Sequence, residues 1–522
     1  MTKMDKILEN NVKFNRNGLV SLVSAAVSGI IIHLFCLLNF LNNYDNIAVQ
    51  PAGYGTGIKS GRWLLTILGD LNATYMGAYN LSWLNGVVGI LFLSVSIYFL
   101  VDIFKIKSRI YAILLGVGFV AFPSVASCML FTYTVQYYSF AILMSVIASY
   151  MLIEGKRKFF VIYGILSAVL IACSLGVYQA YFPLTTAILV LYLIQQTLLS
   201  KDTWKTIICK GFYYLSSLVL GLVLYFVILK LCLKFYGEEL LGYQGISTMG
   251  QMPFVDLIKQ IWYSFAGFFT MPVENSYMLA PLPLLSLIYQ LWNVATAIMI
   301  ITNLIHRKSK PIYWAITLVL CVCFPIAVNL LVIMCANAWI YTLMVHAFVL
   351  LLFVPVVTFE SLYEPQDKYI IVRQGCKHLI SLSLALVVFM YSYLANVSYT
   401  AEYYANRQVE NLANSVVTQV RMTEGFHTGQ KWVFLGKYED PLMSFRWGNV
   451  PLYEGTATPS HLIQSYSWTE WIRHYIGYSV PLADEQKKQE LMKDDTVKEM
   501  PSWPSYGSVR IVDDTVVVKF SD

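Results

Sequence analysis

Long apolar stretches recur along most of the chain, and this feature constrains the fold more than any other. A helix needs roughly 20 predominantly apolar residues to cross the hydrocarbon core of a bilayer. Stretches of this length predict an all-α polytopic membrane protein that crosses the bilayer about eleven times. The predicted spans are residues 18–41, 81–101, 110–128, 129–153, 159–179, 180–200, 212–235, 281–304, 311–334, 337–358 and 379–398.

The composition excludes a soluble globule. Of the 522 residues, 57% are hydrophobic and only 13% are charged, whereas about 25% of residues are charged in an ordinary soluble domain. The net charge of +6 does not indicate a nucleic-acid partner, because the basic residues lie almost wholly in loops between the apolar stretches. The basic segments are residues 3–16, 105–109, 156–158, 201–210, 307–310 and 368–377.

The alternation of these basic loops predicts the orientation of the chain. Lys and Arg accumulate on the cytoplasmic side of a membrane, so we expect a cytoplasmic N-terminus without a cleaved signal peptide. Two long loops that are poor in Lys and Arg, residues 42–80 and 237–280, are expected to face outward. Within them, residues 58–72 and 254–270 are predicted to be helices in the outer interface.

The last part of the chain, residues 399–522, is predicted to be a separate α+β domain outside the membrane. It contains a helical stretch at 401–425, a strand-like segment at 431–436, a second helix around 461–476 and a hairpin that turns at Asp513-Asp514. About 120 residues are enough for an independent core. All nine cysteines precede this part, and no disulfide framework is expected.

The first outer loop contains the first candidates for chemistry, Asp45 and Arg62. A carboxylate near apolar surface can act as a base for a hydroxyl nucleophile, although an ordinary solvated loop acid has the same sequence signal. The planar guanidinium of Arg62 can bind a phosphate at the headgroup plane, or it can simply anchor the interfacial helix. Glu274 belongs to a polar cluster in the second outer loop.

Two further groups of residues lie where predicted spans reach the outer side. Lys230 and Lys234 are one turn apart near the end of the seventh predicted span, where they either bind phosphate or extend along the helix toward the interface. Tyr178, Gln179 and Tyr181 lie at a turn between two predicted spans. They either bind a sugar or form part of an aromatic belt.

Several short motifs, taken in order, resemble the type II glucosyltransferase family, which includes phage-borne enzymes that modify O-antigen. The motifs are Tyr44–Asn46, Ser60–Trp63, Gly176–Tyr181 and, near the end, Met500–Pro504, Gly507–Ser508 and Thr515–Lys519. The resemblance covers most of the chain. It implies a GT-C-like fold, that of the C-type glycosyltransferases.

The resemblance implies that a sugar, commonly glucose, moves from a polyprenyl (undecaprenyl) phosphate to a hydroxyl of a cell-surface polysaccharide outside a bacterial plasma membrane. Asp45 would be the general base, and Arg62, or else Lys230 and Lys234, would stabilise the leaving lipid phosphate. We expect a separate donor synthase and flippase, and no cofactor; a single acid leaves any need for a divalent metal open. The residues expected to contact sugar or acceptor are Tyr44, Asn46, Trp63, Tyr178, Gln179, Tyr181 and Glu274.

A transporter or flippase for lipid-linked glycans is the alternative function. Such a protein also needs many spans, interfacial cations and aromatic residues. It is expected to place charges near the bilayer midplane and to contain repeats, whereas the charged candidate residues of this chain gather at the predicted outer rim.

Overall fold

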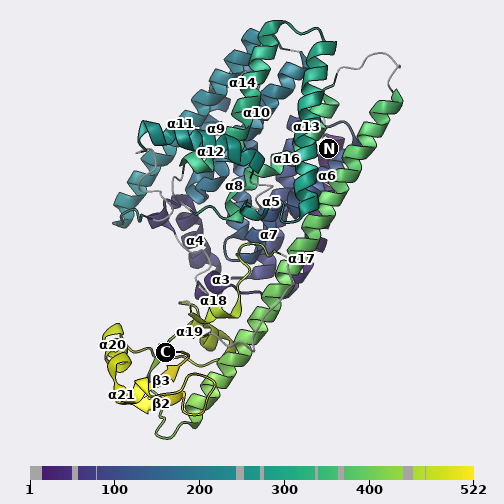
Figure 1. Cartoon of the computed structure of the whole chain (residues 1–522). Helices are drawn as coiled ribbons and strands as arrows, with labels where there is room; N and C mark the ends of the chain where they lie inside the picture. The colour runs from purple at the N-terminus through teal and green to yellow at the C-terminus, as the bar shows by residue number, and fades with distance from the viewer. Residues whose placement is uncertain are drawn as a thin grey trace, which may run out of the picture.

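The computed structural model describes residues 15–49, 57–77, 79–200, 202–242, 252–270, 276–334, 339–362, 370–438, 451–464 and 466–521. Figure 1 shows a bundle of long helices, with α17 running along its side and beyond it to a small unit that contains the C-terminus.

Ten helical segments of the described chain are long and apolar enough to cross a membrane, which confirms the predicted all-α polytopic class. Three of them are composite: the third is divided into α6 and α7, and the fifth and the sixth each begin with a 3₁₀ turn. The helices of the bundle are α2 (Arg16–Leu38), α5 (Ser82–Ile103), α6 (Arg109–Ala121), α7 (Pro123–Leu130), α8 (Val135–Glu154), α9 (Phe160–Val177), α10 (Phe182–Leu199), α11 (Trp204–Tyr236), α13 (Pro283–His306), α14 (Pro311–Val328) and α17 (Ile370–Met422).

Shorter helices connect or lie among the long ones. Those between the long helices are α3 (Tyr44–Ala48), α4 (Trp63–Met76), α12 (Phe254–Thr270), α15 (Leu331–Met334) and α16 (Leu350–Glu360). Both segments predicted to be interfacial, 58–72 and 254–270, contain helix, as a 3₁₀ turn with α4 and as α12. Neither is among the ten long apolar segments.

The span predicted at residues 337–358 is not one long helix. Its described part has 3₁₀ turns at Thr342–Met344 and His346–Val349 before α16 begins. The apolar helical run His346–Glu360 is shorter than the ten long segments. Irregular backbone at membrane depth is tolerated where protein rather than lipid surrounds it. Residues 342–353 are all buried, and His346 Nδ1 shares a hydrogen bond of 2.7 Å with Ser124 Oγ.

Small residues allow the long helices to approach closely. A Cβ atom on Gly116 of α6 would lie 2.6 Å from the Ser21 carbonyl oxygen of α2. On α11, a Cβ atom on Gly221 would lie 2.6 Å from the Ile171 side chain of α9. Close backbone contact of this kind is the usual basis of helix association in a membrane, where the hydrophobic effect contributes little.

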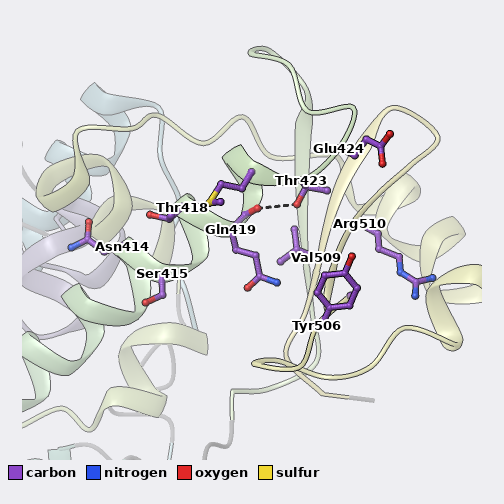
Figure 2. Close-up of a pocket in the computed structure, with 11 residues that line it drawn as sticks. Asn414, Ser415, Thr418, Gln419, Thr423, Glu424, Tyr506, Val509 and Arg510 are labelled. Carbon is purple, nitrogen blue, oxygen red and sulfur yellow. Dashed lines mark hydrogen bonds between the residues drawn. The ribbon is translucent and has the colours of Figure 1, made fainter.

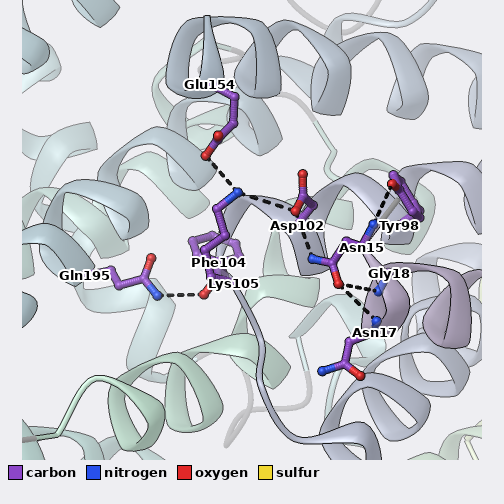
Figure 3. Close-up of polar contacts among 9 residues, drawn as sticks. All are labelled: Asn15, Asn17, Gly18, Tyr98, Asp102, Phe104, Lys105, Glu154 and Gln195. Atoms are coloured by element: carbon purple, nitrogen blue, oxygen red, sulfur yellow. Dashed lines mark hydrogen bonds and ion pairs between the residues drawn. The ribbon is translucent and has the colours of Figure 1, made fainter. Parts of the chain in front are cut away.

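A polar cluster joins four helices at the end of the bundle away from the C-terminal unit (Figure 3). Asn15 caps α2 and donates to Asp102 on α5 at 2.8 Å. Lys105 bridges Asp102, at 3.4 Å, and Glu154 of α8, at 3.1 Å. Gln195 of α10 donates to a backbone carbonyl beside Lys105. The carboxylates of this cluster are therefore occupied by structural contacts.

The C-terminal unit contains a small mixed sheet with strand order β1-β3-β2. β1 (Lys431–Leu435) pairs parallel with β3 (Thr515–Lys519), and β3 pairs antiparallel with β2 (Val509–Val512). Asp513 and Asp514 both have positive φ, 47° and 55°, as a tight hairpin turn requires. The predicted hairpin is confirmed.

The helix predicted around residues 461–476 is broken in the structure. Its described residues form α18 (Pro459–Gln464), α19 (Trp468–Trp471) and a π-helical turn at Ile472–Ile476. Leu462 and Trp471 are both fully buried in the same core. One straight helix would place residues nine apart on opposite faces, so the break allows both side chains to reach that core. The unit also contains α20 (Glu485–Lys493) and α21 (Asp495–Lys498).

α17 connects the bundle to the C-terminal unit without a break (Figure 1). This helix of 53 residues includes the last predicted span and most of the helical stretch predicted at 401–425, and it ends at Met422. The expected boundary between residues 398 and 399 therefore lies inside a continuous helix. Val409, Val416 and Val420 of its distal part pack in one core with Trp432 of the sheet.

Candidate active site

Asp45 is held by α3 at the end of the bundle that carries the C-terminal unit. Asn43 caps this short helix, because its side-chain oxygen accepts from the backbone N–H groups of Asp45 at 3.0 Å and Asn46 at 2.9 Å. The amide groups of Asn43 and Asn46 both donate to the Leu130 carbonyl, at 3.0 and 2.7 Å. Asn46 is thus a buried support of the helix, while Tyr44 packs at the edge of the C-terminal core.

Two phenols donate hydrogen bonds to the Asp45 carboxylate. Tyr133 Oη lies 3.5 Å from Oδ2, and Tyr466 of the C-terminal unit donates to Oδ1. Burial raises the pKa of Asp45, while the two phenols and the charge of Arg62 lower it. Asp45 is therefore a partly buried acid with a cation nearby.

Arg62 lies between a 3₁₀ turn and the start of α4. Gly61 has a φ of 75°, a conformation that favours glycine, and this turn directs the chain into the helix. Arg62 Nη1 donates to Tyr138 Oη at 3.1 Å, and the guanidinium lies 4.7 Å from the Tyr178 ring centroid. The rings of Tyr138 and Tyr178 are stacked, with centroids 4.3 Å apart. This contact orients the planar cation over an aromatic surface.

Two motifs that are far apart in the sequence form one unit around Arg62. Trp63 lies on Gly176, where a Cβ atom would be 2.4 Å from the indole. Gln179 donates to the Ser60 carbonyl and to Tyr225 Oη, both at 3.0 Å. Trp63 and Gln179 are buried, and so is Tyr181, which packs edge-on against Tyr178. These three predicted sugar contacts are therefore buried and pack against the segments that carry Arg62 and Tyr178.

The C-terminal unit covers the side of the site next to α7. Gly455 packs on Leu130, its carbonyl accepts from Asn43 at 3.3 Å, and a Cβ atom there would lie 2.9 Å from Leu130 Cβ. Glu454 accepts from the indole of Trp339 at 3.3 Å and from a backbone N–H group in the following turn. Burial raises the pKa of Glu454. These contacts fix the segment that leads to Tyr466.

The remaining predicted residues lie elsewhere. Lys230 and Lys234 are exposed on α11 and have no hydrogen bond or ion pair with another described residue. Their predicted contact with phosphate stays a prediction. Glu274 lies outside the described residues. Within the described ranges, no group of three or more His, Cys, Asp or Glu side chains is arranged to hold a metal ion.

Sequence reasoning did not select Tyr133, Tyr138 or Tyr466. The first two belong to a tyrosine-rich run that precedes α8 and continues into its first turn, which is a detectable signal beside a membrane boundary. Tyr466 had no such signal, because it reaches Asp45 only through the folding of the C-terminal unit.

The fold and the site define a polytopic membrane protein with a partly buried acid, an arginine and stacked tyrosines at one end of its bundle. The model of the family described as glucosyl transferase GtrII matches residues 34–359, and the chain belongs to this family of glucosyltransferases. The resemblance noted in the sequence is thereby confirmed. The match includes Asp45, Arg62 and Tyr178 but excludes α17 and the unit that contains Tyr466. No curated protein and no solved structure gave a match.

Proposed function

We propose that this glucosyltransferase takes glucose from a polyprenyl phosphate, such as undecaprenyl phosphate, and transfers it to a hydroxyl of a cell-surface polysaccharide. The observation that carries the proposal is the partly buried Asp45, with two phenols on its carboxylate and the Arg62 charge close by. A glycosyl transfer between oxygen atoms needs both a base and a cation of this kind.

In the proposed step, the acceptor oxygen attacks C1 of glucose while the bond from C1 to the phosphate oxygen breaks. The acceptor proton moves to Asp45, and the lipid phosphate leaves with the bonding electron pair as a dianion. Because burial raises the pKa of Asp45, its carboxylate is a better proton acceptor than a fully solvated one.

Arg62 is proposed to stabilise the departing phosphate. The leaving group carries more negative charge than the diester, so a nearby cation stabilises the transition state more than the ground state. Tyr138 and Tyr178 hold the guanidinium in a fixed orientation, which reduces the reorganisation needed at the moment of transfer. Lys230 and Lys234 remain the alternative source of positive charge.

The site is proposed to face the outside of a bacterial plasma membrane. The positive-inside rule supports this orientation, since the basic loops include Lys105 and Lys156 at the opposite end of α5 and α8 from the site. A donor presented outside requires a separate synthase and a flippase that moves the lipid-linked sugar across the bilayer.

The test is transfer of radiolabel from polyprenyl phosphate glucose to cell-wall polysaccharide by the purified protein in lipid nanodiscs. Wild type should move label, and Asp45→Asn should lose about 10²- to 10⁴-fold in rate because an amide cannot accept the proton. Asp70→Asn is the matched control, since Asp70 is an acid of the same loop region that accepts from Tyr236 instead. It should retain activity.

An Asp45→Asn rate within a few-fold of wild type would remove Asp45 from the mechanism. If no polyprenyl phosphate sugar supports transfer, the proposed donor is wrong. Movement of intact donor across the bilayer without transfer would favour a flippase.

A further inference from the structure

A cleft whose lining residues mostly carry polar side chains lies in the C-terminal unit, between the distal end of α17 and the loop that leads into β2 (Figure 2). Its volume is about 890 Å³, within the range of sites that bind small molecules. In Figure 2, Asn414, Ser415, Thr418 and Gln419 lie on the α17 side and Tyr506, Val509 and Arg510 on the other, with the Gln419 side chain extending toward Tyr506. The family match ends before both walls.

The α17 wall has hydroxyl and amide groups at helical spacing. Asn414 and Thr418 are four residues apart, as are Ser415 and Gln419, so these pairs form adjacent rows on one face. The opposite face of the same helix is buried in the core of the unit through residues such as Val416. The polar groups are therefore presented outward by a helix whose other side is fixed.

Gln419 and Asn414 are suited to bind a ligand. Neither side chain has a hydrogen bond to another described residue, whereas Ser415 and Thr423 each donate to a backbone carbonyl of α17 at 2.9 Å. An amide side chain carries two donors and an acceptor. Such a group can bind two neighbouring hydroxyls at once.

The opposite wall contains an aromatic ring. Tyr506 is 100% exposed, which is unusual for a large aromatic side chain on a folded unit. Arg510 and Glu424 line the same cleft with opposite charges, so the cleft has no excess of one sign. An open ring, free amides and balanced charge fit a ligand that is neutral, rich in hydroxyls and has apolar C–H faces.

We propose that this cleft binds the acceptor polysaccharide as a neutral glycan chain. The inference rests on the proposed function and names the acceptor-binding part of it. Tyr506 would stack on a sugar face, while Gln419 and Asn414 would bind sugar hydroxyls.

The position of the cleft suits a polymer rather than a single sugar. Asn406 of α17 exchanges two hydrogen bonds of 2.8 Å with the backbone of Asn42, three residues before Asp45. Gln419 lies further along the same helix by roughly 20 Å, at about 1.5 Å per residue. A glycan bound in the cleft must therefore extend over several sugar units to reach Asp45.

The test measures equilibrium binding to the full-length protein in nanodiscs, with no donor present. The probe is polysaccharide released from the wall of the producing cells and separated by anion exchange into a neutral and an anionic fraction. We expect the neutral fraction to bind wild type and to bind the double variant Gln419→Ala/Tyr506→Ala at least tenfold more weakly. Tyr506→Phe should retain most of the affinity because the ring remains.

Gln489→Ala is the matched control, since Gln489 is an exposed amide on α20 of the same unit. It should bind like wild type. Equal affinity of the double variant and wild type, or binding of the anionic fraction alone, would overturn the proposal. The measurement does not depend on transfer. A cleft that does not bind the glycan is therefore distinguishable from an incorrect proposed reaction.

Discussion

The phenol of Tyr466 donates a hydrogen bond to the carboxylate of Asp45, and the two residues are 421 positions apart in the chain. One residue follows the first long helix, and the other belongs to the unit after the last. The candidate active site is therefore assembled from both ends of the protein. One of the hydrogen bonds to the Asp45 carboxylate comes from a segment outside the family match.

Loss of the Tyr466 phenol should change the pH dependence of transfer. The hydrogen bond favours the charged carboxylate and so lowers the pKa of Asp45. In Tyr466→Phe that pKa should rise, and because the base must be deprotonated, the acidic limb of the kcat/KM profile should move to higher pH. Activity at alkaline pH should change less.

The matched control for this profile is Tyr478→Phe, because Tyr478 packs on Trp432 in the same unit. Its acidic limb should coincide with that of wild type. If Tyr466→Phe also leaves the limb in place, the contact between the phenol and Asp45 does not operate during catalysis.

Arg62→Ala should lower kcat more than it raises KM. A cation that acts on the departing phosphate contributes mainly to the transition state. Arg62→Lys should recover only part of the loss, because a lysine cannot reproduce the two-pronged contact or the stacking on Tyr178. Steady-state kinetics with varied donor concentration separate the two parameters.

Lys59→Ala provides the comparison for Arg62→Ala. Lys59 is a cation of the same turn but pairs with Glu238 at 2.9 Å on the surface, so its removal should have little effect. A rise in KM alone for Arg62→Ala would mean that the arginine binds the ground state and the transition state equally well. Lys230 and Lys234 would then be the better candidates for the leaving-group charge.

Gly176→Ala should destabilise the protein and reduce activity together. The added methyl group would lie 2.4 Å from the Trp63 indole, and overpacking of this kind typically costs about 1–3 kcal/mol. The displaced indole adjoins Arg62, so the cation should also lose its orientation. Thermal unfolding in detergent and the transfer rate measure the two effects.

Gly211→Ala on α11 is the appropriate control, since its nearest contact, Leu193, would be 3.8 Å from the new methyl group. Alanine should be tolerated or slightly stabilising at that position. A Gly176→Ala protein with wild-type stability and rate would mean that Trp63 does not support the site.

Cysteine labelling of intact cells tests the orientation of the chain. Cys209, Cys323 and Cys376, which are the exposed cysteines among the described residues, and Cys335, which lies outside them, are first replaced by Ser. A membrane-impermeant maleimide should then label Glu490→Cys on α20 in intact cells, and should label Lys156→Cys only after lysis. The reverse pattern would place the active site in the cytoplasm.

The membrane-spanning architecture was predictable from the sequence because a bilayer imposes a simple rule. Backbone polar groups in lipid must be satisfied within each segment, so long apolar stretches become helices. The hairpin at Asp513-Asp514 was predictable from a local pattern, since two strand-like runs flank a short polar turn. The sequence placed Asp45 and Arg62 in one outer loop, and in the structure the charge of Arg62 lowers the pKa of Asp45. Their roles in transfer stay predictions.

Other features depend on tertiary contacts, which local sequence patterns do not reveal. The chain at residues 342–349 turns instead of continuing as a helix because protein surrounds it and supplies its polar contacts. α17 continues past the apolar stretch because its distal part packs on the sheet. The contacts of Asp45 with Tyr466 and of Gln179 with Ser60 join distant segments. Composition and periodicity describe neighbours along the chain, whereas these contacts depend on which surfaces meet after folding.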